Sequence, residues 1–126
     1  MKKSSILISA DSLKRKNPVL PQLKKEIHSL LLDINAKIEE ANKNGIVEIY
    51  YNLPIIFRNI ECSYLSNADI QKYIYDNVMD EINKKGFDAK IRTTKTETIV
   101  KISWRIDLYT PEESIKIRQK LQDMTF

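Results

Sequence analysis

The feature that most constrains this chain is one long amphipathic segment. Between Leu20 and Asn44 the apolar residues recur at helical spacing, which predicts a continuous helix. At 1.5 Å per residue this helix is about 37 Å long, close to the diameter of about 36 Å expected for a compact chain of this size. Its apolar side is therefore core along its length, or its ends pack against a second copy. The candidate side chains for such a homodimer interface are Leu23, Ile27, Leu30, Ile34 and Ile38.

A half-buried strand follows. Gly45 offers backbone that turns at low conformational cost, so the helix is expected to end there. From residue 46 to residue 53 apolar and polar side chains alternate, which is typical of a strand with one buried face. Pro54 ends the strand, and residues 55–65 hold no period, so we expect an irregular connection there.

A second helix has signals at both ends. Ser66 or Asn67 caps its start, Asp69 lies in its first turn, and Gly86 marks its end. Its apolar row is Ile70, Ile74, Val78 and Ile82. The sequence therefore predicts an amphipathic helix from about residue 67 to residue 85.

The remainder predicts a hairpin and a final helix. Alternating segments 89–93 and 100–106 flank a polar tip at residues 94–97. Thr110 and Pro111 then fit the cap and the first position of a helix that runs to about Asp123.

The order of these elements indicates an α+β fold. We expect helix, strand, helix, hairpin and helix to build a small, mainly antiparallel sheet that the helices cover on one face. With 126 residues the chain has room for one core. We divide it into a basic N-terminal arm, residues 1–18, and a single α+β domain, residues 19–126.

Charge is concentrated in two places. The net charge of +4 is accounted for by the first sixteen residues, which include Lys14, Arg15 and Lys16, whereas the rest of the chain is neutral. On the predicted hairpin, the side chains that alternate with the apolar set include Lys90, Arg92, Lys101 and Arg105. With Tyr50 nearby, such a face has the chemistry to meet phosphate and stack a base. The alternative reading is an ordinary solvated face of an antiparallel sheet.

Residues suited to catalysis are scarce. Nucleophilic catalysis needs an oriented base, and the only histidine is His28, which we expect at the edge of the first helix's apolar stripe or facing solvent. Spacing leaves a pairing of His28 with Cys62 open, but no local signature supports one. The chain has too few cysteine and histidine residues for a structural zinc site and no glycine-rich phosphate loop. We therefore expect a protein that is not an enzyme and holds neither metal nor cofactor.

The single Cys62 and the short apolar stretch near the N-terminus favour a protein that is neither secreted nor membrane-bound. An unpaired cysteine is typical of a reducing compartment, and the N-terminal apolar stretch is too short for a signal core or a membrane span.

Three motifs carry a resemblance to a known family. They are the strand 45–54 that ends in Leu-Pro, the helix end Lys85-Gly86-Phe87, and Lys101-Ile102-Ser103-Trp104 on the hairpin. In order and spacing they resemble a family of small, uncharacterised proteins of nucleocytoplasmic large DNA viruses. The resemblance implies a virus-encoded protein of the host cytoplasm or the virion, and it supplies no catalytic residues.

Three classes of function follow. The first is a non-enzymatic interaction or structural protein, homodimeric, that acts in virion or replication-site assembly with another viral or host protein. The second is a nucleic-acid-binding protein that uses the basic hairpin face and the N-terminal arm. The predicted order of elements in the chain is compatible with a winged helix if residues 55–65 supply one more helix. An enzyme is the third class and the least favoured.

Overall fold

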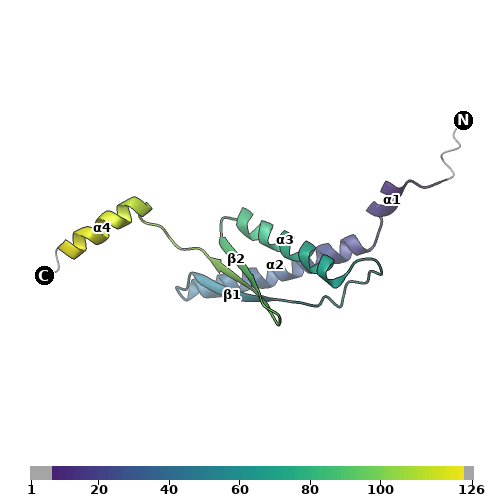
Figure 1. Cartoon of the computed structure of the whole chain (residues 1–126), viewed down its shortest axis with the longest axis horizontal. Helices are drawn as coiled ribbons and strands as arrows, with labels where there is room; N and C mark the ends of the chain where they lie inside the picture. Colours follow the sequence, from purple (N-terminus) through teal and green to yellow (C-terminus); the bar gives the residue numbers. More distant parts are fainter. Residues whose placement is uncertain (1–6, 124–126) are drawn as a thin grey trace, which may run out of the picture.

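The α+β fold is confirmed by a computed structural model, which describes residues 7–123 (Figure 1). In chain order the elements are α1 (Ala10–Arg15), α2 (Val19–Lys43), β1 (Glu48–Leu53), α3 (Asn67–Lys84), β2 (Asp88–Thr93), β3 (Thr98–Ser103) and α4 (Pro111–Asp123). The long helix, the capped helix, the first strand, the first strand of the hairpin and the final helix all form close to their predicted bounds. Residues 55–65 are irregular, as expected.

The last strand of the chain occupies the centre of the sheet. The strand order is β1-β3-β2, and β3 pairs antiparallel with both neighbours. β1 and β2 therefore run parallel to each other, and α3 is the crossover that joins them. On β3 the inward residues Val100 and Ile102 are fully buried, whereas the alternating Lys101 and Ser103 are only partly buried.

α2 and α3 pack against the inner face of this sheet. The buried side chains of α3 are its predicted row, among which Ile74 and Val78 lose all contact with solvent. Phe57 and Ile60 of the irregular connection complete the core. Burying such aliphatic side chains stabilises the fold by roughly 1.5–3 kcal/mol each.

The structure places the predicted dimer-interface residues of α2 in or against the core of the chain. Leu23, Leu30 and Ile34 are buried in the chain's own core, and Ile27 and Ile38 are partly buried against it. The deepest part of the apolar stripe of α2 is therefore covered within one chain. A second copy could reach Leu23 and Leu30 only if the core opened.

Specific contacts fix the position of the sheet against α2. The Tyr51 hydroxyl donates a hydrogen bond to Asp33 Oδ2 at 2.6 Å, and Lys37 Nζ lies 5.9 Å from the centre of the Tyr51 ring. Burial and the neighbouring Asp33 carboxylate raise the pKa of Tyr51, so this phenol stays a hydrogen-bond donor. At the other end, Trp104 Nε1 donates to Asn42 Oδ1 at 3.0 Å.

α4 does not cover the sheet as we had expected. It buries none of its side chains and projects from one end of the body, while α1 projects from the other (Figure 1). The predicted second strand of the hairpin is also too long, because β3 ends at Ser103 and Ile106 is 82% exposed. Within the predicted N-terminal arm, residues 10–15 form α1, while residues 1–6 lie outside the described part of the chain.

Gly86 ends α3 in the manner predicted. Its φ of 94° lies in the left-handed region, its N–H donates to the Asn83 carbonyl, and the Phe87 N–H donates to the Ile82 carbonyl. This is the hydrogen-bond pattern of a Schellman motif. Gly45 ends α2 with a φ of 75°. Both glycines of the chain thus reverse it between a helix and a strand.

Replacing Gly86 tests this reading. A Cβ at Gly86 would meet no atom within 4 Å, so the cost of Gly86→Ala is conformational and should be about 1–2 kcal/mol of unfolding free energy. Gly86→Asn should lose less, because asparagine tolerates the left-handed region. Urea denaturation measures both variants, and an equal loss in the two would contradict the conformational explanation.

Candidate nucleic-acid interface

The outer face of the sheet carries polar rows that cross all three strands. Lys101 on β3 pairs in register with Tyr50 on β1 and with Lys90 on β2. The neighbouring row places Arg92 beside Ile99 in the same way. Because α2 and α3 occupy the inner face, these side chains point to the side that no helix of the described residues covers (Figure 1).

These side chains surround a shallow hollow. Tyr50, Lys90, Arg92, Ile99 and Lys101 line a depression of about 280 Å³. Tyr50 is 65% exposed, so much of its side chain is accessible from solvent. The volume lies just below the range of roughly 300–1,000 Å³ for drug-sized ligands, which suits one group of a larger ligand.

Glu48 organises one side of this hollow. Its Oε1 lies 3.5 Å from Lys101 Nζ and 3.5 Å from Arg105 Nη2, and its Oε2 accepts a hydrogen bond from the Tyr50 hydroxyl at 3.2 Å. Partial burial opposes ionisation of Glu48. The positive charge of Lys101, the hydrogen bond from Tyr50 and the charge of Arg105 outweigh it and lower the pKa of Glu48. The carboxylate therefore stays ionised and aligns these three side chains.

The structure brings together five of the eight predicted nucleic-acid-binding residues. Tyr50, Lys90, Arg92 and Lys101 line the hollow, and Arg105 joins them through Glu48. Sequence reasoning missed the role of Glu48, although the alternation in β1 had placed it on the same side as Tyr50.

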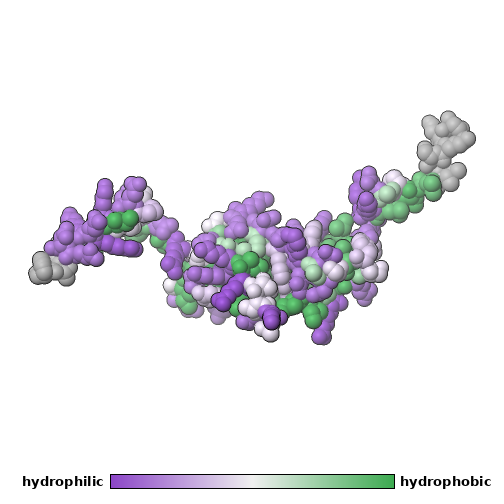
Figure 2. Space-filling model, in the orientation of Figure 1, coloured by the Kyte–Doolittle hydropathy of each residue, from purple (hydrophilic) through white to green (hydrophobic). Residues whose placement is uncertain are grey.

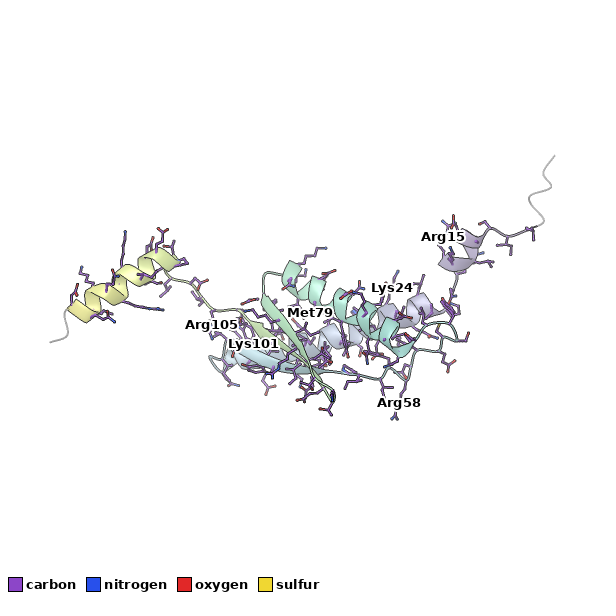
Figure 3. The ribbon with its side chains drawn as sticks, in the orientation of Figure 1. Arg15, Lys24, Arg58, Met79, Lys101 and Arg105 are labelled. Carbon is purple, nitrogen blue, oxygen red and sulfur yellow. The ribbon has the colours of Figure 1, made fainter. Side chains whose placement is uncertain are left out.

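The other three predicted residues, Lys14, Arg15 and Lys16, lie elsewhere. They belong to α1 and its C-terminal cap, and Figure 3 shows Arg15 at the opposite end of the molecule from Lys101 and Arg105. All three side chains are exposed. The two basic segments therefore do not form one continuous site.

Among residues 7–123, the groove that His28 borders includes Glu81 but not Cys62. The His28 side chain is exposed, as expected, and this apolar groove lies between α2 and α3, whereas Cys62 interacts with Tyr64 in the irregular connection. Among residues 7–123 no three His, Cys, Asp or Glu side chains are arranged to hold a metal ion. Within the same residues, no helix has the length and apolar character needed to cross a membrane.

Comparison with known proteins yields no relative, because no family model, no curated protein and no solved structure matches this chain. The interpretation of the basic sheet face therefore depends on its own geometry.

Removing Lys101 should raise the pKa of Glu48. In Lys101→Gln the carboxylate loses its strongest electrostatic support, and carboxyl-detected NMR titration should show the change. Because folding lowers this pKa, the stabilising contribution is complete above the unfolded-state value near 4.5 and is lost as the pH falls through the folded-state value.

Lys72→Gln is the matched control, since Lys72 pairs with Asp76 on the exposed side of α3. It should leave the pKa of Glu48 unchanged. An unaltered titration of Glu48 in Lys101→Gln would show that the contact at 3.5 Å contributes nothing in solution.

Proposed function

We propose that this protein is a non-enzymatic binding protein that holds single-stranded nucleic acid on the outer face of its sheet. The observation that carries the proposal is the hollow in which the exposed ring of Tyr50 lies among Lys90, Arg92 and Lys101.

The aromatic ring favours a single strand over a duplex. An exposed tyrosine on an open sheet offers a stacking platform, and stacking of one base on an aromatic side chain contributes about 1–3 kcal/mol. Bases of a single strand can splay out onto such a platform, whereas bases of a duplex are already stacked and paired. Ile99, partly buried at the floor of the hollow, adds apolar contact to the base.

The cations supply the contacts to phosphate. Lys90, Arg92, Lys101 and Arg105 lie along one face, so a strand that follows them would meet successive positive charges. Glu48 offsets part of this charge in the free protein. Phosphate groups would compete with Glu48 for Lys101 and Arg105, which should make affinity moderate and sensitive to salt.

The winged-helix version of this function is not supported. That arrangement needed an additional helix between β1 and α3, and residues 55–65 form none. The sheet here is instead a crossover unit with β3 inserted between two parallel strands, and its open face presents the candidate site.

An assembly role is the second candidate, because α4 carries exposed apolar side chains and an apolar groove lies between α2 and α3. The virion or replication-site setting implied by the family resemblance stays a prediction. Assembly and nucleic-acid binding use different surfaces and can coexist in one protein.

Tyr50→Ala should weaken binding of a short fluorescent oligothymidine by about 5- to 150-fold, which corresponds to the loss of one stacked base. Tyr50→Phe should keep most of the affinity, because the ring stacks and the hydroxyl only contacts Glu48. Fluorescence anisotropy measures both variants. Equal affinity of Tyr50→Ala and the unmodified protein would remove the stacking site from the proposal.

Neutralising two cations should flatten the salt dependence. In the double variant Lys90→Gln and Arg92→Gln, the slope of log affinity against log salt should fall by about 1.4, at about 0.7 for each phosphate contact to a single strand. The matched control is Lys72→Gln with Lys84→Gln, which removes the same charge from α3 on the other side of the sheet. Identical slopes in the two double variants would mean that only overall charge matters.

A further inference from the structure

An apolar groove lies on the helical side of the body, away from the basic sheet face. It has a volume of about 230 Å³ and runs between α2 and the end of α3. Its apolar lining includes Leu31, Leu32, Ile38 and Phe87, and Glu81 and Lys85 also line it. Leu32 is 58% exposed, although leucine is a residue that folding normally buries.

The segment from Arg105 to Asp123, which we call the tail, has the complementary property. It comprises the linker 105–110 and α4, and its exposed apolar side chains include Leu108, Tyr109 and Ile115. In Figure 2 the visible face of α4 is mostly hydrophilic and carries one small hydrophobic patch, apart from the body. α4 has an N-terminal cap but buries none of its side chains. Helix propensity alone stabilises a short helix little, because most helices in proteins depend on packing against other elements.

We propose that the tail of one copy docks in the groove of a second copy, and that the second copy returns the same contact. This reciprocal exchange produces a symmetric homodimer. This interface would include Ile34 and Ile38 of the predicted α2 stripe, which line the groove, whereas Leu23 and Leu30 stay in the core of each copy.

The charges of the tail and the groove are complementary. Glu81 lies in the last turn of α3, and Lys85, four residues later, is the C-cap of this helix. Both side chains therefore border the same side of the groove. Glu112 and Lys116 have the same spacing on α4, and Ile115 lies between them. When α4 docks antiparallel to α3, Glu112 faces Lys85 and Lys116 faces Glu81, while Ile115 enters the groove.

The linker favours exchange over docking within one chain. The body holds the chain up to Trp104, which stacks edge-on against Phe87 with ring centroids 6.0 Å apart. Beyond it, residues 105–110 contain no glycine and lead α4 away from the body (Figure 1). To reach its own groove, the tail would have to reverse its direction within these six residues. Short connections of this kind favour exchange between copies.

The residues available to this contact are numerous enough for a specific interface. Each copy would contribute side chains from residues 106–123 of its tail, since Arg105 stays paired with Glu48 on the sheet face, and the ten residues that line its groove. Specific interfaces bury roughly 20–30 residues a side, so about 10–20 residues of the tail would complete this one. The basic sheet face stays open in this arrangement, because the groove belongs to the helical layer.

Light scattering coupled to size-exclusion chromatography over a dilution series of the full chain tests the proposal. The unmodified protein should form a concentration-dependent dimer. Leu32→Lys in the groove and Ile115→Glu in α4 should each weaken self-association about tenfold or more, because an apolar side chain is lost at both symmetric contacts. Both side chains are more than half exposed, Ile115 at 54%, so circular dichroism should show unchanged folding.

Mixing the two variants distinguishes exchange from docking within one chain. In a mixed dimer the intact tail of Leu32→Lys meets the intact groove of Ile115→Glu, and the other contact pairs Lys with Glu, so the dimer should return. Ile56→Glu, at a side chain that is 64% exposed and outside both surfaces, should dimerise like the unmodified protein. A monomer at every concentration, variants that associate as tightly as Ile56→Glu, or a mixture that stays monomeric would each overturn the proposal.

Discussion

The rest of the structure depends on the alternation of side chains along β3. Val100 and Ile102 face inward, where α2 and α3 cover them, and Lys101 between them faces outward. Because β3 pairs with both other strands, its register decides which residues of β1 and β2 enter the core. A slip by one residue would bury Lys101 and expose two core side chains. The core and the basic face are thus two results of one pairing.

On the outer face of the sheet, the fold brings charged side chains together without forming a deep pocket. Tyr50 and Lys101 become neighbours because the strands pair, and Glu48 then draws Arg105 toward them from beyond the end of β3. In the free protein these contacts preorganise cations that would otherwise move independently. The same carboxylate reduces the positive potential, so the face is suited to a ligand that replaces Glu48 by phosphate.

Local signals explain most of what the sequence predicted correctly. Capping and glycine geometry act over a few residues, so both ends of α3 could be read from Ser66 and Gly86. The basic face was predictable as a side of the hairpin, but the Glu48 contacts needed the register between strands about fifty residues apart. The apolar stripe of α2 indicated that its side chains are buried, but it did not indicate which elements they pack against. For α4, the sequence pattern predicted the helix correctly, but the expected packing of this helix on the sheet is not found.

The central position of β3 also has a consequence for synthesis on the ribosome. β1 ends at Leu53 and β3 begins at Thr98, so 44 residues must be translated between them. At about 5–20 residues per second this takes roughly 2–9 s. Throughout that interval the nascent chain holds β1 without a partner strand and α2 without its sheet. Chaperones and premature strand pairing would compete for this exposed surface until the middle strand emerges.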